Sequence, residues 1–353
     1  MNSKMTKIAI FGHFGFGKEL LNGQTVKTKN LVEALVDKFG QDQIMQFDTA
    51  GGLKALFKLP FQIKNSLKEA EDIIIVPAHR GIRVISPMLL HFNKKKKRRI
   101  HYVVVGGWLP SLCLKEPKLA AKIKAFDYIY VETSTMKKAL DNQGFSNVVV
   151  MPNFKFLNPL SCSQLNYQCL EPFSVCTFSR VMKEKGIEDA IDAVKKINAD
   201  NKKITYKLDI YGQVDSSQIA WFESLKRGFP SFVQYKGCIP SNQSVEVIRN
   251  YFAVLFPTKF YTEGIPGTII DAYCAGVPVI ASRWESFNDL IDDGKTGIGY
   301  DFSNKDNLVS VLAKIAREPN IINEMKTNCL ERAKVYSPTL VIETLRLSKK
   351  KHD

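Results

Sequence analysis

Short β-rich runs alternate with helical patterns along the chain, and this alternation constrains the fold more than any other feature of the sequence. Six such runs occupy the first half, at residues 8–11, 44–47, 73–76, 101–105, 128–131 and 148–151. Five more follow in the second half, at residues 173–178, 206–211, 232–235, 254–256 and 277–281. Parallel strands need a crossover, usually a helix, to bring the chain back in the same direction. The sequence therefore predicts an α/β protein with two doubly wound parallel sheets.

The alternation is interrupted between residues 153 and 172, where Asn, Pro, Ser and Gln are frequent and no period is visible. Such a segment is typical of a linker. A chain of 353 residues also exceeds the size at which a single core usually keeps growing. We therefore expect one domain over residues 1–160, a second over 161–336, and a final segment, 337–353, that is helical over 338–350.

The formal net charge of +15 indicates anionic partners, among which are nucleic acid, anionic lipid and phosphorylated substrates. Basic residues bunch at 94–99 and 349–351, and aromatic residues are not interleaved with these runs as a base-stacking groove requires, so nucleic acid is not the expected partner. One basic run follows the apolar residues 88–92, a combination that suits an anionic membrane surface; the alternative is a helix end followed by a solvated loop. This run consists of Lys94, Lys95, Lys96, Lys97, Arg98 and Arg99.

Several classes of protein are not expected from this sequence. The seven cysteines are scattered and never spaced Cys-x-x-Cys, which argues against a disulfide framework or a zinc site. No Asp-x-Asp occurs, so we expect no metal, and no lysine-anchored cofactor motif occurs, so we expect no cofactor. No apolar run approaches the roughly 20 residues of a membrane-spanning helix, and the N-terminus predicts a strand. We expect a cytoplasmic protein, peripheral at the inner face of the membrane.

Residues 261–299 combine a loop, a glycine-opened helix and a buried strand, and carry two acids, Glu263 and Asp271. Both acids are placed to face a ligand at the N-terminus of the helix, where free backbone N–H groups bind phosphate. Glu263 has a second interpretation, as an acid placed at a helix start for the sake of the helix dipole. The residues expected to bind a phosphorylated sugar here are Gly264, Ile265, Pro266, Gly267, Thr268 and Asp271.

Arg180 and Lys185 lie in the turn that follows the first strand of the second domain. A guanidinium and an ammonium stabilise the charge of a diphosphate leaving group without a metal. The alternative is a solvated basic turn. We expect both side chains at a diphosphate.

The first strand runs into a glycine loop that includes Gly15 and Gly17, but the spacing is not the Gly-x-Gly-x-x-Gly of dinucleotide binders. This argues against a dehydrogenase, and ordinary turn chemistry is an alternative interpretation of the loop. His79 ends another strand and is a candidate proton shuttle, although such a histidine is often purely structural. Trp108 is a candidate platform on which a sugar stacks.

The stretch around Glu263 resembles the family 4 retaining glycosyltransferases of GT-B fold. Their mark is a Glu, seven residues, a second Glu and then Ala-x-Ala-x-Gly-x-Pro-Val-Ile-Ala. Here Asp271 stands where the second Glu is usual. The motif continues with Ala272, Cys274, Ala275, Gly276, Pro278, Val279, Ile280 and Ala281. The resemblance implies two Rossmann-like domains facing a central cleft, acceptor bound by the first and nucleotide sugar by the second, with the last helix crossing back to the first.

The resemblance also implies roles for individual residues. Arg180 and Lys185 would contact the donor diphosphate, Glu263 the donor sugar, and Asp271 the ribose hydroxyls. Family members commonly place a histidine at the end of the fourth strand, where this chain lacks one, and His79 would substitute in part. The further residues are Gly15, Gly17 and Gly237 for the donor and Gln24 and Trp108 for the acceptor.

The implied activity is metal-independent transfer of a hexose or N-acetylhexosamine, with retention, from a nucleotide diphosphate sugar, UDP-sugar foremost. The acceptor would be a hydroxyl of a glycan or lipid-linked saccharide in cell-envelope polysaccharide synthesis. One alternative is a GT-B epimerase or phosphorylase. Another is a catalytically silent subunit that binds nucleotide sugar or membrane and supports a partner glycosyltransferase.

Overall fold

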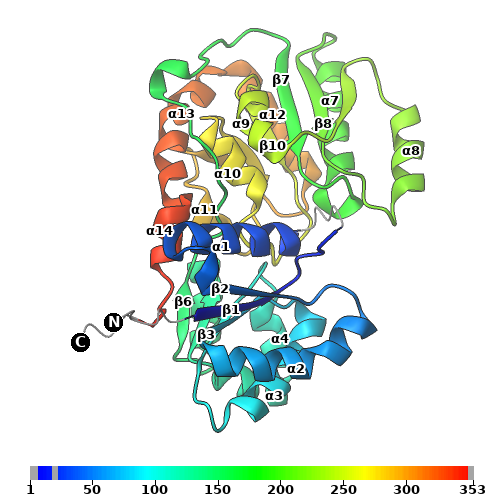
Figure 1. Cartoon of the computed structure of the whole chain (residues 1–353). Coiled ribbons are helices and arrows are strands. Elements are labelled where there is room, and N and C mark those ends of the chain that lie inside the picture. The colour runs from blue at the N-terminus through cyan, green and yellow to red at the C-terminus, as the bar shows by residue number, and fades with distance from the viewer. Residues whose placement is uncertain (1–6, 18–22, 349–353) are drawn as a thin grey trace. The chain divides into compact units, whose positions relative to one another are not determined.

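The computed structural model describes residues 7–17 and 23–348 and divides the chain into two compact units (Figure 1). Unit 1 comprises Met1–Phe154 and Pro338–Asp353, and unit 2 comprises Lys155–Ser337. The division therefore falls after Phe154 rather than after the expected residue 160, and the final segment belongs to the first unit.

Unit 1 is built on a six-stranded parallel sheet with the order β2-β1-β3-β4-β5-β6. Its strands are β1 (Lys7–Gly12), β2 (Ile44–Asp48), β3 (Ala70–Ile75), β4 (Arg99–Val103), β5 (Tyr128–Val131) and β6 (Val148–Val150). Its helices are α1 (Gly23–Phe39), α2 (Leu53–Glu69), α3 (His79–Asn93), α4 (Leu109–Lys115), α5 (Pro117–Lys124), α6 (Ser134–Asp141) and α14 (Pro338–Glu343), with a 3₁₀ turn at Gln41–Gln43.

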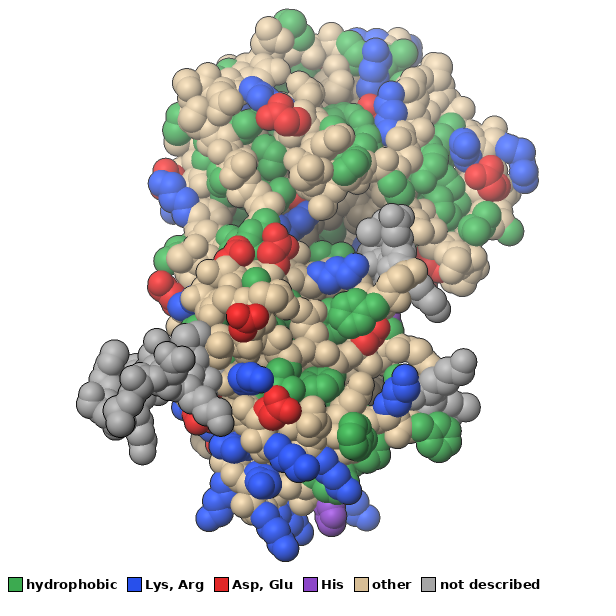
Figure 2. All heavy atoms as spheres, viewed as in Figure 1, with side chains coloured by type: hydrophobic (Ala, Val, Ile, Leu, Met, Phe, Trp, Pro, Cys, Tyr) green, Lys and Arg blue, Asp and Glu red, His purple; other side chains and the backbone are tan. Residues whose placement is uncertain are grey.

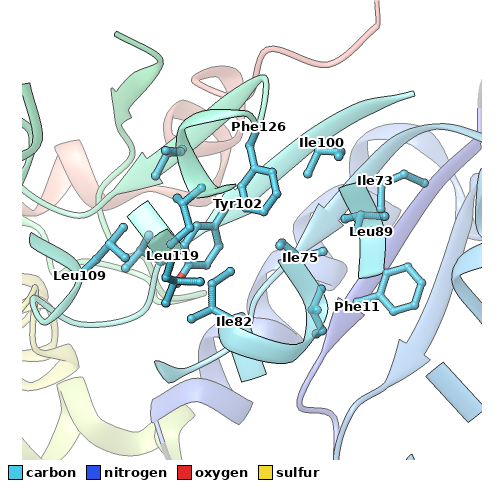
Figure 3. Packing of buried hydrophobic residues seen from close by; sticks show 14 of the residues in the cluster. Phe11, Ile73, Ile75, Ile82, Leu89, Ile100, Tyr102, Leu109, Leu119 and Phe126 are labelled. Atoms are coloured by element: carbon cyan, nitrogen blue, oxygen red, sulfur yellow. The ribbon is translucent and has the colours of Figure 1, made fainter. Parts of the chain in front are cut away.

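The core of unit 1 forms where apolar side chains of the central strands meet the helices (Figure 3). Ile73 and Ile75 point to the same side of β3, since side chains alternate along a strand, and both are fully buried. Ile82 and Leu89, seven positions apart on α3, repeat at the helical period and pack against them. Each such side chain contributes roughly 1.5–3 kcal/mol when fully buried.

The expected helix over residues 338–350 is only partly present. The observed helix, α14, ends at Glu343. The last two residues of the expected helix, 349 and 350, lie outside the described part of the chain. Residues beyond the helix use their backbone N–H groups on side chains of the sheet. Arg346 N donates to Tyr130 Oη at 2.9 Å, and Ser348 N donates to Asp72 Oδ2 at 3.0 Å. These bonds hold the segment in a non-helical conformation.

Unit 2 is built on a second six-stranded parallel sheet, with the order β12-β11-β10-β7-β8-β9. Its strands are β7 (Phe173–Phe178), β8 (Tyr206–Tyr211), β9 (Val233–Gly237), β10 (Ala253–Phe256), β11 (Val279–Ser282) and β12 (Gly297–Tyr300). Its helices are α7 (Ile187–Asp200), α8 (Ile219–Arg227), α9 (Ser244–Ile248), α10 (Gly267–Cys274), α11 (Phe287–Leu290), α12 (Lys305–Arg317) and α13 (Asn320–Ala333). Short 3₁₀ turns lie at Cys162–Gln164, Lys183–Lys185, Ser241–Gln243 and Lys334–Tyr336.

The two sheets confirm the predicted pair of Rossmann-like doubly wound domains. In unit 2 the strand order reverses between β7 and β10, and in unit 1 between β1 and β3. Ligands of such sheets bind beyond the carboxyl ends of the strands at this reversal. The loops after β7 and β10 are therefore the first place to look for a site in unit 2. None of the described helices combines the length and the apolar character needed to cross a bilayer.

Candidate active site

The loops after β7 and β10 touch at the reversal point of unit 2. Gly186 has a left-handed backbone, with φ of +70°, and a Cβ at this position would lie 1.9 Å from the carbonyl oxygen of Pro257. Next to this contact, Lys259 N donates to the carbonyl oxygen of Glu184 at 2.8 Å. Only glycine permits both the conformation and the approach. The contact fixes the position of Lys185, the residue before the glycine.

Lys185 and Glu263 form an ion pair at this place, with 2.5 Å between Nζ and Oε2. Their side chains are 14% and 19% exposed, so both charged groups are largely shielded yet open to a ligand on one side. Thr258, itself buried, donates its hydroxyl to the same carboxylate oxygen at 3.3 Å. The structure thus brings together two residues that lie 78 positions apart and that the sequence had singled out separately.

Aromatic rings complete the surroundings of the Lys185 ammonium. Its Nζ lies 5.4 Å from the ring centroid of Phe256 and 5.1 Å from that of Phe260. Ring faces attract a cation, and more strongly where water is excluded. The arrangement presents a positioned cation for a phosphate and a carboxylate for hydroxyl groups at one point.

Arg180 does not share this ion pair. Its guanidinium lies 3.4 Å from Asp215 Oδ2, and its side chain is more exposed than that of Lys185. Val181 pairs with Val214 in an isolated parallel bridge, which sets the direction of the Arg180 segment. The two cations expected together at a diphosphate are therefore paired with different carboxylates.

Asp271 is buried and faces other partners than expected. Its Oδ1 accepts from Lys155 Nζ at 2.5 Å and from Ser244 Oγ at 2.8 Å. Burial raises the pKa of Asp271, while the charge and hydrogen bond of Lys155 and the hydrogen bond of Ser244 act in the opposite direction. Neither partner was predicted from the sequence. Lys155 lies in the segment expected to be a linker, where no sequence pattern points to a site.

The start of α10, close to these residues, has no side-chain cap. Gly267 is its first residue, Pro266 precedes it, and no acid stands in its first turn. Thr268 is buried and donates its hydroxyl to the carbonyl oxygen of Phe178 at the end of β7. A Cβ on Gly267 would lie 3.5 Å from Lys155 Cδ, so Lys155 runs alongside this helix end. The partial positive charge of the helix N-terminus is not offset by an acid of its own first turn.

The remaining glycines and apolar residues of the expected donor site have distinct positions. Gly264 and Ile265 are buried in the loop before α10. Gly237, at the end of β9, has φ of +74°, and a Cβ there would meet nothing within 4 Å. Glycine is therefore favoured at position 237 by backbone conformation and not by space.

In unit 1, the glycine loop after β1 is held by Asp48, the last residue of β2. Gly15 and Gly17 have φ of +61° and +78°. Asp48 accepts from Phe14 N at 2.9 Å and from Phe16 N at 3.1 Å. Burial opposes the charge on Asp48, but backbone N–H groups of Ala50 and of the loop outweigh it and lower the pKa of the carboxyl. The loop has a defined shape that depends on this carboxylate.

His79 and Trp108 are brought into contact in unit 1, with ring centroids 4.7 Å apart and planes at 59°. His79 begins α3, and Trp108 donates Nε1–H to the carbonyl oxygen of Val105 at 2.7 Å. Gln24 Nε2 donates to the carbonyl oxygen of Val76, beyond the end of β3, at 2.8 Å. His79, Trp108 and Gln24 therefore all lie at the carboxyl edge of the unit 1 sheet.

A buried ion pair at the same edge escaped sequence reasoning. Lys27 Nζ lies 2.5 Å from Glu132 Oε1, both side chains are only 3% exposed, and Lys27 also donates to the carbonyl oxygen of Val104 at 2.9 Å. The available signal was the position of Glu132 directly after the buried strand β5. In the described residues, no three His, Cys, Asp or Glu side chains gather as a metal site.

Comparison with known proteins finds one family model that is similar to part of the chain. Residues 170–335 match the family described as Glycosyl transferases group 1, a stretch that includes Lys185 and Glu263. A curated relative is the UDP-N-acetylglucosamine–peptide N-acetylglucosaminyltransferase GtfA subunit of Streptococcus pneumoniae serotype 4. It is 25% identical over 214 residues, which are 60% of this chain and 41% of that protein. The aligned part thus spans about two fifths of the relative's length.

Two solved structures share the whole fold. The sucrose-phosphate synthase of Thermosynechococcus elongatus superposes with a TM-score of 0.76 at 15% identity, over 96% of this chain and 97% of that chain. HepE of Anabaena, solved in complex with UDP-glucose, superposes with a TM-score of 0.73 at 13% identity, over 96% and 98%. The chain therefore has the GT-B fold of these structures, and residues 170–335 are similar to the group 1 glycosyltransferases.

Proposed function

We propose that the chain transfers a hexose or N-acetylhexosamine from a nucleotide diphosphate sugar to a hydroxyl of a glycan or lipid-linked saccharide. The observation that carries this proposal is the Lys185–Glu263 ion pair of 2.5 Å at the reversal point of the unit 2 sheet, in the loops that precede the uncapped start of α10. A cation and a helix N-terminus suit the diphosphate, and the carboxylate suits the sugar.

The donor is a UDP-sugar in this proposal. HepE is solved with UDP-glucose, and the name of the GtfA subunit gives UDP-N-acetylglucosamine as its donor. Binding of the diphosphate would draw the Lys185 ammonium from Glu263 to phosphate oxygens, and Arg180 would follow from its exposed contact with Asp215. Backbone groups of residues 264–268 and of Gly237 serve the same donor.

Transfer proceeds with retention and without metal, in the manner of family 4. The diphosphate departs first, eased by Lys185 and Arg180, and the acceptor hydroxyl attacks the same face of the sugar. The leaving phosphate oxygen takes the acceptor proton, so atoms and charges balance without a protein nucleophile. Glu263, released from Lys185, accepts from sugar hydroxyls and steadies positive charge near the anomeric carbon.

Unit 1 binds the acceptor in this proposal. Trp108 supplies an indole face for a sugar, His79 is held against it, and Gln24 lies at the same edge of the sheet. Gly15 and Gly17, whose loop is shaped by Asp48, offer backbone N–H groups to the donor phosphates.

The protein is cytoplasmic and peripheral in this proposal, docks on an anionic membrane and serves cell-envelope polysaccharide synthesis. The basic run divides in two. Lys94, Lys95, Lys96 and Lys97 are exposed. Arg98 donates to the carbonyl oxygen of Leu67 at 3.2 Å, and Arg99 pairs with Asp72 at 3.0 Å. The four lysines are therefore the residues of the run that are accessible to a membrane in this proposal.

Turnover of a panel of UDP-, GDP- and ADP-sugars tests the transfer. We expect release of UDP with a soluble saccharide acceptor, and losses of about 10²–10³ in kcat for Lys185→Ala and Glu263→Ala. Lys183→Ala is the matched control, because this exposed lysine lies in the same turn and its Nζ is directed to the ring of Trp221. Full turnover by Lys185→Ala contradicts the assignment.

The second candidate is a catalytically silent subunit that binds nucleotide sugar and supports a partner glycosyltransferase. The observation that favours it is Asp271, whose carboxylate is engaged by Lys155 and Ser244 instead of being open to a ribose. Intact binding of UDP-sugars by calorimetry, with no turnover of any donor by the unmodified chain, supports this candidate over the first.

A further inference from the structure

Helix α2 exposes aromatic and basic residues along one face. Phe57, Phe61, Lys64 and Lys68 follow each other at helical spacing, and all four are exposed. The two phenylalanines are 83% and 77% exposed, the highest values among the large hydrophobic side chains of the described residues. The opposite face of the helix, with Ile63 and Leu67, is buried in the core of unit 1.

A crevice joins this face to the end of α3. It has a volume of about 240 Å³ and is lined by residues of α2 together with Phe92 and Lys96. Lys64 Nζ lies 4.9 Å from the ring centroid of Phe92, so ammonium groups and aromatic rings are interleaved here. The complete lining consists of Phe61, Lys64, Asn65, Leu67, Lys68, Phe92 and Lys96.

The charge of this surface has one sign. The crevice lining contains three lysines and no acid. Glu69, the one acid of α2, pairs with Lys7 at 3.2 Å. Figure 2 shows Lys and Arg side chains gathered over the end of unit 1 where Figure 1 places α2 and α3, with hydrophobic side chains beside them. Such a surface complements an anionic layer with an apolar interior.

We propose that α2 is a membrane-insertion helix: Phe57 and Phe61 enter the acyl region of an anionic leaflet, and Lys64, Lys68 and Lys96 bind lipid phosphates in the crevice. The inference rests on the proposed membrane partner and adds a second element to the lysines of residues 94–97. The strength of binding at a membrane surface scales with buried apolar area plus attraction to anionic lipids, and the two phenylalanines and the three lysines supply these two contributions. Each lysine near an anionic surface raises the affinity roughly fivefold.

Co-sedimentation of the full chain with vesicles tests this proposal, using phosphatidylcholine alone and with phosphatidylglycerol. We expect binding only to the anionic vesicles, a loss of about tenfold or more for Phe57→Ser/Phe61→Ser, and a loss of about 100-fold for Lys64→Gln/Lys68→Gln/Lys96→Gln. The matched controls are Leu114→Ser, an apolar residue 67% exposed on α4, and Lys295→Gln/Lys314→Gln in unit 2, both exposed. The controls are expected to bind as the parent does.

Phe61→Trp gives a readout that does not depend on removing a side chain. Lipids brominated in the acyl chains are expected to quench the new fluorescence, and the parent's own tryptophans define the background. Binding by the phenylalanine variant equal to that of the parent, or absence of added quenching, overturns the proposal. Turnover with soluble donor and acceptor is measured on the same preparations, so a failure of glycosyl transfer is distinguished from a failure of membrane insertion.

Discussion

Gly186 lies so close to Pro257 that a Cβ on the glycine would stand 1.9 Å from the proline carbonyl oxygen. The two residues belong to the loops that carry Lys185 and Glu263. Because Gly186 also has φ of +70°, two independent constraints exclude other side chains at this point. The geometry of the ion pair therefore depends on a backbone contact beside it.

Gly186→Ala is expected to lower the free energy of unfolding by about 2–5 kcal/mol, since left-handed strain and overpacking add. The loops must also separate, so turnover is expected to fall with stability. Gly237→Ala is the matched control, because it has a similar φ of +74° and open space around the Cβ position. It is expected to cost about 1–2 kcal/mol.

Urea unfolding of the two variants measures the difference in stability, and turnover of Gly186→Ala at a temperature where it remains folded measures the effect on the site. If Gly186→Ala and Gly237→Ala lower the free energy of unfolding equally, backbone strain alone accounts for the loss. The close approach of Pro257 then adds no destabilisation.

Much of the fold could be predicted because local pattern and position in the sheet agree. The strands at 173–178 and 206–211 have the predicted bounds, since the first is rich in apolar residues and the second alternates apolar with polar residues at the period of a strand. Strand β12 was missed, since two of its four residues are glycines, which have low strand propensity. A Cβ on Gly297 would lie 2.3 Å from the carbonyl oxygen of Val279, so the approach of β11 explains this glycine.

The candidate site was predictable where residues follow strands and unpredictable where they meet from afar. Lys185 and Glu263 stand in loops after strands, where side chains reach the carboxyl edge of the sheet. Lys155 gave no such signal, because its partner Asp271 is 116 positions away and its own segment has no period. The ion pair of Lys27 could not be predicted for another reason. Lys27 lies on a helix whose sequence pattern is that of an ordinary amphipathic helix.

Lys155→Met is expected to destabilise the protein by about 3–5 kcal/mol at pH 7, because Asp271 then lacks its buried cationic partner. Burial raises the pKa of Asp271, so its contribution to stability is present below about pH 4 and lost as pH rises through the folded pKa. Removing Lys155 removes an opposing influence. The penalty is therefore expected to grow from pH 4 to pH 7.

A double-mutant cycle with Asp271→Asn, followed by urea unfolding, measures this pair. The double variant is expected to be more stable than additivity predicts, by about 0.5–3 kcal/mol. Lys137→Met is the control, because its pair with Asp141 is exposed and is expected to contribute less than about 1 kcal/mol. Strict additivity at residues 155 and 271 contradicts a direct interaction.

Asp48→Asn is expected to lower stability by about 1–3 kcal/mol at pH 7, because backbone N–H groups of the glycine loop lose a carboxylate. The pKa of Asp48 is lowered in the folded state, so its stabilisation is present above the ordinary value of 3.8 and lost as pH falls through the folded pKa. The difference between parent and variant should thus be constant at neutral pH and shrink in acid.

Chemical denaturation between pH 3 and pH 7 measures that difference, and the exposed Asp42→Asn serves as the control. A gap between parent and Asp48→Asn that widens in acid would show that the carboxyl does not hold the loop as a carboxylate.

Trp108→Ala is expected to raise the acceptor KM about tenfold, because a sugar loses the indole face on which it stacks, while donor hydrolysis stays near the parent's rate.

His79→Phe keeps a ring against Trp108, whose centroid lies 4.7 Å away, but removes the nitrogens. It separates packing from proton chemistry: a fall in kcat of about 10²-fold with unchanged KM identifies proton transfer by His79. His91→Phe is the matched control, since His91 lies on the same helix and its ring centroid is 5.2 Å from that of Phe92. Steady-state kinetics with a soluble acceptor make the measurement. If His79→Phe keeps the pH profile and kcat of the parent, His79 only supports Trp108 and transfers no proton. If Trp108→Ala leaves the acceptor KM unchanged, the acceptor does not bind at this edge of unit 1.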